Sequence, residues 1–355
     1  MNAGGAETFL MKIYRTIDRS KYQMDFCVNL KDNYYSQEIS QLGGKIFVIP
    51  SRSQSIKEHN KQLSCVIREG KYKYVMAISS NTTCYLDMLI AKKSGASRCI
   101  VRSSNSSNGT GFKELLIHKT LQIFLSKYID VMISPSDLAA KFLFGSKALK
   151  QGKIHYLHNA INYDLFKFNA SYRETIRKEN SIADDCILVG HVGRFNTQKN
   201  HEKLIDIFKF YHQRNPNSKL MLIGIGNLQE EIRKKVKELD LEDSVLFTGL
   251  RNDVNKMLSA MDVFVLPSFF EGMPNVVIEA QANGLPCVIS DTITREANIT
   301  GLVKYVSLNS SDCIWSDVVE ESIQNREFNT FEKFKHAGYL IEDVAKEFVN
   351  CIFEL

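Results

Sequence analysis

The chain has 355 residues, of which 44% are hydrophobic and 24% are charged, and its formal net charge is +5. This composition is typical of an ordinary soluble globular protein, and the length predicts two domains of about 150 to 200 residues each. Neither an apolar run of the roughly 18 residues needed for a membrane span nor a signal peptide is recognisable, so we expect a cytoplasmic protein. The eight cysteines contain no C-x-x-C pair, which favours buried reduced thiols over disulfides or zinc.

The net charge is divided unevenly along the chain. Residues 1–155 contain 23 Lys and Arg against 11 Asp and Glu, a balance of +12, and residues 156–355 contain 22 against 29, a balance of −7. A basic first half can attract anionic lipid or a diphosphate-bearing acceptor. It carries no nucleic-acid motif and little interleaving of aromatic with basic residues, so nucleic acid is not expected as a partner. A basic surface without any partner stays open as an alternative.

The first half of the chain alternates between strand-like and helical stretches. It opens with Gly4 and Gly5, which permit close backbone approach to a ligand, followed by a predicted helix. This strand-then-helix rhythm predicts a parallel sheet with helices on both faces. Strands are predicted at 25–30, 45–50, 74–79, 98–103, 131–136 and 154–159, and helices at 55–69 and 85–94.

One loop departs from this rhythm. Residues 102–109 read RSSNSSNG, a polar cluster at the carboxyl end of a predicted strand. Such a loop, which includes Ser104 and Asn105, is a candidate acceptor-binding segment.

The second half restarts the pattern with a predicted strand at 187–192 that ends in Gly193. Arg194 and Lys199 are five positions apart on the following loop, directly before a helix. Two cations at a loop-to-helix junction fit a diphosphate group. A second strand, at 219–223, ends in a turn that contains Gly224 and Gly226.

Residues 263–290 read as a strand at 263–266, a loop, a helix and a second strand at 287–290, and they organise the rest of this half. Glu271 lies on the loop at the carboxyl end of the first strand, where open α/β sheets bind ligands. Glu279 lies on the predicted helix 274–283, which Gly284 ends. The helix start at 272–275 offers free N–H groups to a phosphate. Each of the two carboxylates can bind a diol, and the helix start between them can bind a phosphate. This combination predicts a sugar-nucleotide site.

Several of these segments resemble the retaining glycosyltransferases of family four, which have the GT-B fold. Residues 269–286 carry F-E-G-M-P-N followed by E-A-x-A-x-G-x-P, which is similar to the E-x7-E signature. Residues 193–200 resemble the G-R-x4-K-(G/N) motif, and residues 245–254 resemble the F-x-G-x-x-x-D-V segment. The opening G-G-A-E and residues 156–162 resemble the family's first loop and its passage into the second domain.

The resemblance implies an α/β protein with two doubly wound Rossmann-like domains that face a cleft. The N-terminal acceptor-binding domain would be residues 1–162, with a C-terminal helix at about 331–355 crossing back to it. The sugar-nucleotide-binding domain would be residues 163–330.

The resemblance also implies roles for individual residues. Arg194 and Lys199 would grip the donor diphosphate, Glu271 the sugar hydroxyls and Glu279 the ribose. No metal is expected, because the sequence has no D-x-D pattern, and no cofactor is implied. The further donor-binding residues would be Gly193, Gly224, Gly226, Leu250, Gly272, Met273, Pro274, Asn275 and Val276, and the acceptor side would include Gly4, Gly5, Ser104 and Asn105.

Two features depart from the family pattern. The family has a strand before its first glycines, but only Met1 to Ala3 precede them here. Either the translation start lies further upstream or the chain is a truncated copy. A histidine that many relatives carry in the acceptor loop is also absent, and Arg102 and Ser104 stand at the matching positions.

The expected activity is therefore transfer of a sugar from a nucleotide-diphosphate sugar to a lipid-linked saccharide, with retention, in the assembly of bacterial exopolysaccharide, capsule or lipopolysaccharide. The enzyme would be peripheral on the inner face of the cell membrane. Two alternatives stay open: a non-catalytic paralogue that binds sugar nucleotide, and a GT-B sugar-nucleotide epimerase.

Overall fold

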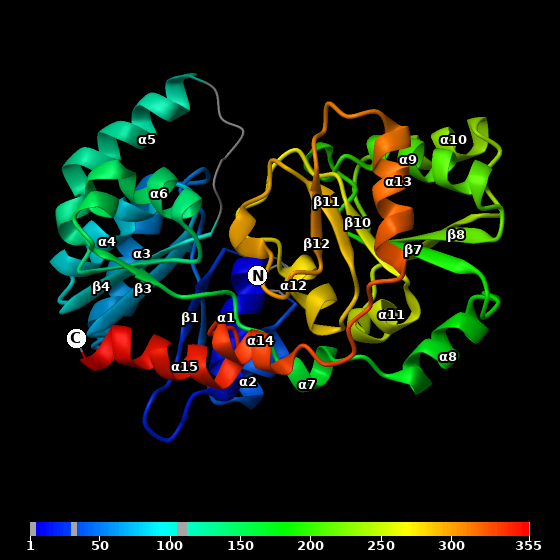
Figure 1. The fold of residues 1–355 in the computed structure, drawn as a ribbon. Helices are drawn as coiled ribbons and strands as arrows, with labels where there is room; N and C mark the ends of the chain where they lie inside the picture. The colour runs from blue at the N-terminus through cyan, green and yellow to red at the C-terminus, as the bar shows by residue number, and fades with distance from the viewer. Residues whose placement is uncertain (1–4, 30–33, 105–111, 355) are drawn as a thin grey trace. The chain divides into compact units, whose positions relative to one another are not determined.

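The computed structural model describes residues 5–29, 34–104 and 112–354, which divide into two compact units (Figure 1). Unit 1 comprises residues 1–160 and 339–355, and unit 2 comprises residues 161–338. The chain therefore leaves unit 1 once and returns to it for its last helix. The predicted α/β class with parallel sheets in two Rossmann-like domains is confirmed.

Unit 2 contains one six-stranded sheet in which every pair of neighbouring strands is parallel. The strand order is β12-β11-β10-β7-β8-β9, which is the order of a doubly wound sheet. Its central strands are buried along most of their length, as their runs of apolar and β-branched residues predict. The strands are β7 (Ile187–Val192), β8 (Ser218–Ile223), β9 (Val245–Gly249), β10 (Val263–Leu266), β11 (Cys287–Ser290) and β12 (Val303–Val306).

Helices cover both faces of this sheet (Figure 1). On one face α9 (His201–Arg214) packs against α10 (Gln229–Glu238) and α13 (Asp312–Ile323), whose Trp315 is fully buried in the core. On the other face α8 (Ala170–Glu179) packs against α11 (Val254–Ala260). The remaining helices of the unit are α7 (Tyr163–Phe166), η2 (Thr197–Lys199), α12 (Asn275–Ala282), η3 (Arg295–Ala297) and α14 (Phe331–His336).

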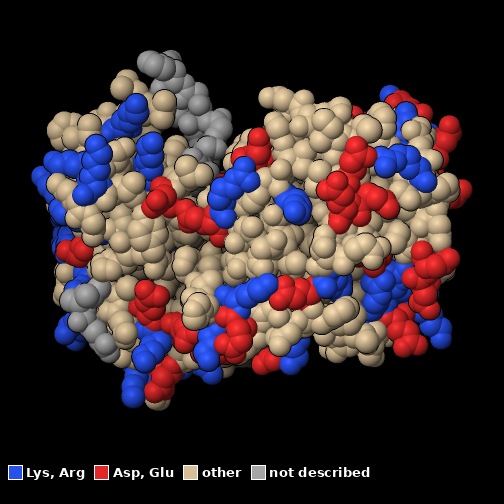
Figure 2. Space-filling view, in the orientation of Figure 1, with Lys and Arg blue, Asp and Glu red and all other residues tan. Residues whose placement is uncertain are grey.

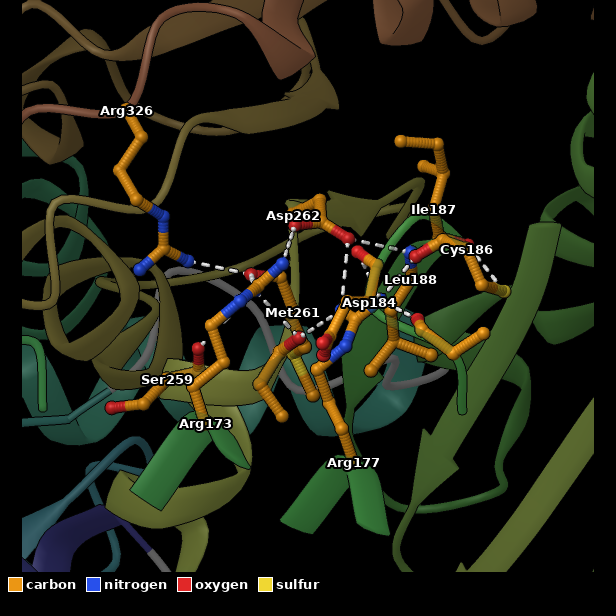
Figure 3. Close-up of polar contacts among 12 residues, drawn as sticks. Arg173, Arg177, Asp184, Cys186, Ile187, Leu188, Ser259, Met261, Asp262 and Arg326 are labelled. Carbon is orange, nitrogen blue, oxygen red and sulfur yellow. Dashed lines mark hydrogen bonds and ion pairs between the residues drawn. The ribbon is translucent and has the colours of Figure 1, made fainter. Parts of the chain in front are cut away.

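A largely buried carboxylate joins α8 to the amino ends of β7 and β10 (Figure 3). Asp262 accepts hydrogen bonds from Arg173 at 2.7 Å, from Arg177 at 3.3 Å and from the backbone N–H of Leu188 at 2.7 Å. The Asp262 N–H in turn donates to the Leu188 carbonyl at 2.8 Å. Because both arginines lie one turn apart on α8, one carboxylate fixes a helix and two strands together.

The described residues of unit 1 form two parallel sheets instead of the single predicted one. The smaller sheet has the order β1-β2 and the larger has the order β3-β4-β5-β6. Residues of β4 and β5 alternate between two apolar cores, one on each face of the larger sheet. The strands are β1 (Phe26–Val28), β2 (Ile46–Val48), β3 (Tyr74–Ser79), β4 (Arg98–Ser103), β5 (Val131–Ser134) and β6 (Ile154–Tyr156).

The helices of unit 1 form two layers around these strands. On one side α3, α4 and α6 contribute to a shared core, and on the other α1 packs against α15. Helix α5 lies at the edge of the unit, beside α4 and α6 (Figure 1). The helices are α1 (Gly5–Thr16), α2 (Ser36–Gln41), α3 (Ile56–Glu69), α4 (Cys84–Lys93), α5 (Phe112–Leu125), η1 (Ser126–Tyr128), α6 (Asp137–Lys150), α15 (Ile341–Val349) and the π-helix η4 (Asn350–Glu354).

A cavity of about 560 Å³ separates the two sheets of unit 1. It is lined by Phe26 and Cys27 of β1, by all of β3 and by residues of α1 and α15. Among the described residues, β1 pairs only with β2, and β3 pairs only with β4. In unit 2 the corresponding place, between β8 and β10, is filled by β7. The gap therefore lies where the family pattern has its first strand, and residues 1–4 are outside the described part of the chain.

The single helix expected near the C-terminus is wrong. The chain forms α14 in unit 2 and α15 in unit 1, and Gly338 between them has φ 70°. A positive φ ends an α-helix, and glycine adopts it without steric cost. Only α15 and η4 therefore return to unit 1.

We predict that Asp262→Asn lowers the unfolding free energy of unit 2 by about 3–5 kcal/mol, because it leaves two poorly exposed guanidinium groups without their carboxylate. Urea denaturation followed by fluorescence of Trp315, the chain's only tryptophan, measures this unit directly. The control is Glu238→Gln, which removes an exposed ion pair with Lys234 and should cost no more than about 1 kcal/mol. Equal effects of the two substitutions would contradict the assignment.

Candidate functional site

The candidate site of unit 2 lies where the order of strands reverses. From β7 the chain proceeds through β8 and β9 to one edge of the sheet, and it then crosses back to β10, β11 and β12 on the other side. The loops that follow β7 and β10 therefore diverge at the carboxyl ends of adjacent strands, which is where doubly wound sheets bind ligands. The β7–β10 pairing is also short, since only Val189↔Val263 and Gly190↔Phe264 are in register.

An ion pair joins these two loops. The Lys199 Nζ atom lies 2.6 Å from Glu271 Oε1, and both side chains are largely buried. Gln198 donates to the Phe270 carbonyl at 2.9 Å and to Glu271 Oε2 at 3.2 Å, while the Phe269 N–H donates to the Gln198 carbonyl at 2.9 Å. Lys199 and Glu271, two of the three residues that the sequence predicts to be catalytic (the third is Arg194), are thus in direct contact, although 72 positions separate them.

Arg194 lies on the same loop as Lys199 but in a different environment. Its side chain is exposed, and it has no ion-pair partner among the described residues. Lys199 is positioned by the loop itself, because its N–H donates to Asn196 Oδ1 at 3.2 Å and Asn200 adopts the left-handed conformation before α9. One cation is therefore free for an incoming anion, and the other is held by a carboxylate.

The predicted glycines bring the loops after β7 and β8 into close backbone contact. A Cβ atom on Gly224 would lie 2.1 Å from the Gly193 carbonyl oxygen, and one on Gly226 would lie 2.2 Å from the Phe195 carbonyl oxygen. The Gly224 φ of +137° is also strained for any other residue. The close packing of two loops thus requires glycine at both positions, independently of any ligand. The Gly224 N–H donates to the Gly249 carbonyl at 2.9 Å, next to exposed Leu250.

Helix α12 begins beside Glu271. Pro274, the first residue of the predicted helix, is instead the N-cap residue, so α12 begins one position later than predicted, and Gly284 with φ 70° follows its end. Gly272, Met273 and Pro274 are buried, whereas Asn275, Val276 and Glu279 are half-buried. The first helical N–H groups, a half-buried carboxylate and the Lys199–Glu271 pair are therefore parts of one loop–helix unit, which can bind an anion and the hydroxyl groups next to it.

The sequence of this region matches a known family. Residues 172–329 match the family described as glycosyl transferases group 1. Over 328 residues the chain is 34% identical to the putative glycosyltransferase EpsF of Bacillus subtilis, covering 90% of this chain and 84% of the relative.

The chain belongs to the group 1 glycosyltransferases. It is also 28% identical over 260 residues to the UDP-Gal:alpha-D-GlcNAc-diphosphoundecaprenol alpha-1,3-galactosyltransferase of Escherichia coli, covering 70% of this chain and 66% of the relative. Among solved structures, Anabaena Alr3699/HepE in complex with UDP and glucose has a TM-score of 0.79 at 16% identity, over 99% of this chain and 96% of that one. The structural neighbours of the present chain are GT-B glycosyltransferases, which confirms the predicted fold.

Two buried histidines behind this glycosyltransferase site were not identified from the sequence. The His191 Nδ1–H donates to the Val265 carbonyl at 2.9 Å, and the His191 ring centroid lies 4.7 Å from that of His201. His201 stacks on Phe195, and among the described residues neither of its ring nitrogens has a hydrogen-bond partner. Burial, with Lys199 nearby, lowers the His201 pKa to about 4 and the His191 pKa well below 6.5. Both rings are therefore neutral at pH 7 and add no charge beside Lys199.

The residues predicted on the acceptor side belong to unit 1. Gly5 begins α1, and Ser104 follows β4, where its N–H donates to the Ser79 carbonyl at 3.2 Å. Gly4 and Asn105 are outside the described residues. Arg102, which stands at one of the family's histidine positions, points into unit 1: it donates to Asn159 Oδ1 at 2.7 Å and lies over the Phe9 ring.

Burial of Arg102 lowers its pKa to about 9, and among the described ion pairs it has no carboxylate partner.

All eight cysteines are free, and five of them are buried. Within residues 5–29, 34–104 and 112–354 the structure contains no cluster of three or more potential metal ligands from His, Cys, Asp and Glu. The same ranges include no helix that is long and apolar enough to cross a membrane.

We predict a pH dependence of unit 2 stability from His201. An unfolded histidine binds a proton near pH 6.5 and His201 only near pH 4, so acidification between these values favours the unfolded state. The unfolding free energy should therefore fall as the pH is lowered from 6.5 toward 4, by up to about 1.4 kcal/mol per pH unit for this group. His201→Phe should reduce that slope, while His336→Gln, which changes an exposed ring, should not. Identical slopes in wild type and His201→Phe would contradict a neutral buried ring.

Proposed function

We propose that the chain is a retaining, metal-independent glycosyltransferase that moves a sugar from a nucleotide-diphosphate sugar to a lipid-diphosphate-linked saccharide during synthesis of a bacterial surface polysaccharide. The observation that carries this proposal is the contact between Lys199 and Glu271 at the β7–β10 switch point, beside the start of α12. A cation, a carboxylate and helix N–H groups lie together at the edge where such sheets bind nucleotides, and this arrangement supports the proposal.

In this proposal the reaction depends on positioning and on stabilisation of the leaving group. Arg194 and the α12 start offset the negative charge that develops on the diphosphate as the sugar leaves. Lys199 shares its charge between the diphosphate and Glu271, which holds hydroxyl groups of the transferred sugar. Glu279 holds the ribose, and the loops that contain Gly224, Gly226 and Leu250 border the base. None of the residues is assigned as a covalent nucleophile.

The relatives support the proposed substrates. The Escherichia coli relative acts on a diphosphoundecaprenol-linked sugar, and the Anabaena structure holds UDP and glucose. A lipid-linked acceptor resides in a membrane, so we place the protein on the cytoplasmic face of the cell membrane, with the basic unit 1 toward anionic lipid. Residues 1–155 contain the excess of 12 positive charges on which this placement rests.

A second candidate is a protein that binds sugar nucleotide without transferring the sugar. The gap between β1 and β3 favours it, because that gap lies in the unit assigned to the acceptor. The two candidates differ in one measurement, since both bind a nucleoside diphosphate but only the transferase converts the donor to product.

We expect Arg194→Ala to weaken binding of nucleoside diphosphates by about 1.5–3 kcal/mol, because it removes a charge-assisted contact. Calorimetry with UDP, GDP and ADP identifies the base and measures the loss, and binding of the unphosphorylated nucleoside should not change. Lys234→Ala, which alters an exposed lysine of α10, is the matched control. Unchanged diphosphate affinity in Arg194→Ala would remove this residue from the site.

We expect Glu271→Gln and Glu279→Gln to have separate effects. For Glu279→Gln, affinity for the donor and for the free nucleoside diphosphate should fall together, by about 1–2 kcal/mol, because the ribose contact weakens. In the case of Glu271→Gln, the nucleoside diphosphate should bind normally while transfer falls by about tenfold or more, because this contact positions the reacting sugar.

Turnover of the donor sugar, measured in buffer with excess EDTA, and calorimetry of the free nucleotide distinguish the two variants. Glu238→Gln, on an exposed helical face, is the control and should match wild type. Wild-type transfer by Glu271→Gln would overturn the central assignment, and absence of any transfer by wild type with intact binding would favour the second candidate.

A further inference from the structure

Helix α5 has its apolar side chains on the outside. The exposed fractions are 61% for Leu116, 55% for Ile117, 72% for Ile123 and 67% for Phe124. Positions 116, 120 and 123, and positions 117 and 124, follow the three-, four- and seven-residue spacing of one helical face. The exposed side of α5 is therefore an apolar stripe of these four residues, interrupted by Thr120, where a surface helix normally has mainly polar residues.

The inner side of the same helix is held by polar groups. His118 Nε2 lies 2.9 Å from the Phe142 carbonyl oxygen, and Gln122 donates to the Phe142 and Leu143 carbonyls at 3.1 and 2.9 Å. All of these bonds connect α5 to α6. Since the polar residues are used inside the unit, the apolar residues remain available to a partner on the outer side.

Among the described residues, exposed lysines outnumber exposed carboxylates on α5, on α6 and directly after α5, although Asp137 begins α6. Lys119 on α5 and Lys127 directly after it are exposed, and so are Lys141, Lys147 and Lys150 on α6. Nearby Asp130 is already paired with Lys92 at 2.6 Å. Figure 2 shows mainly tan and blue atoms over α5 and α6, at the upper left of the molecule, with little red.

We propose that α5 docks unit 1 onto an anionic membrane, with Leu116, Ile117, Ile123 and Phe124 at the acyl boundary and the neighbouring lysines among the headgroups. Choosing lipid as the partner rests on the proposed function, because a lipid-linked acceptor lies in such a surface. An apolar helical face flanked by lysines is the arrangement that binds membrane interfaces.

The surrounding charge distinguishes lipid from a second copy of the chain. Two copies that paired through α5 would bring the same lysines of α5 and α6 together, which like-charge repulsion opposes. An anionic membrane instead attracts every one of these lysines. The charge around the stripe therefore favours lipid over self-association.

Flotation of the full chain with vesicles tests the proposal. Wild type should bind vesicles of phosphatidylcholine and phosphatidylglycerol at low salt, bind more weakly at high salt, and bind poorly to phosphatidylcholine alone. Leu116→Ser with Ile123→Ser should lower binding to the anionic vesicles by at least about tenfold. Ile314→Ser with Phe331→Ser, which changes two exposed apolar residues of unit 2, is the matched control and should bind like wild type.

Fluorescence locates the contact independently. Because the only tryptophan, Trp315, is fully buried, a tryptophan placed by Ile123→Trp reports its own surroundings. Its emission should shift to the blue and become shielded from acrylamide on anionic vesicles, whereas that of Ile314→Trp should not change.

Wild-type vesicle binding by the double serine variant would overturn the proposal. So would a wild-type dimer in sedimentation that this variant loses, because a second copy would then cover the stripe. Nucleoside diphosphate affinity should be the same in all these variants, so failure of the membrane proposal and failure of the nucleotide proposal appear in different measurements.

Discussion

The clamp that Asp262 forms at the amino ends of β7 and β10 is the constraint on which the site depends. One carboxylate binds the Leu188 N–H and two arginines of α8, and so it fixes where these two strands start. Their ladder then contains only two residue pairs before the strands separate. β7 and β10 are fixed together at their amino ends, and the loops that follow their carboxyl ends are joined by the Lys199–Glu271 ion pair. The hydrogen bonds of Asp262 thus have a structural role, at the opposite end of these strands from the candidate site.

At the carboxyl ends of these strands, the charged groups of the candidate site lie around Lys199, whose side chain is largely buried. Lys199 is neutralised by Glu271, and the two histidines behind it are held uncharged by burial and by the lysine itself. Arg194, in contrast, is exposed. An incoming diphosphate would meet the solvated guanidinium of Arg194 and the ammonium of Lys199, which it would have to share with Glu271. The site is therefore organised before a ligand binds, which lowers the cost of reorganisation during a reaction.

Much of this architecture could be predicted from the sequence, and the failures have physical causes. Apolar runs flanked by glycine or proline predicted β7, β10 and β11 with their observed bounds, because fully buried parallel strands have that pattern. The C-terminal helix was predicted as one because periodicity does not reveal that Gly338 adopts a positive φ. Glu271 and Lys199 were each selected from motifs, but their contact depends on strand order. His191 and His201 resembled ordinary strand and helix residues, and only their shared burial shows their neutral state.

The gap beside β3 affects how unit 1 exchanges its amide hydrogens. Most of β3 is only half-buried, whereas the central strands of unit 2 are buried along most of their length. A strand with a ladder on one side opens locally at a lower free energy than one with ladders on both sides. Exchange at β1 and β3 would therefore proceed through small openings, while exchange at β7 would require disruption of the whole six-stranded sheet. Unit 2 would thus be the more rigid of the two units, and unit 1 the more adaptable.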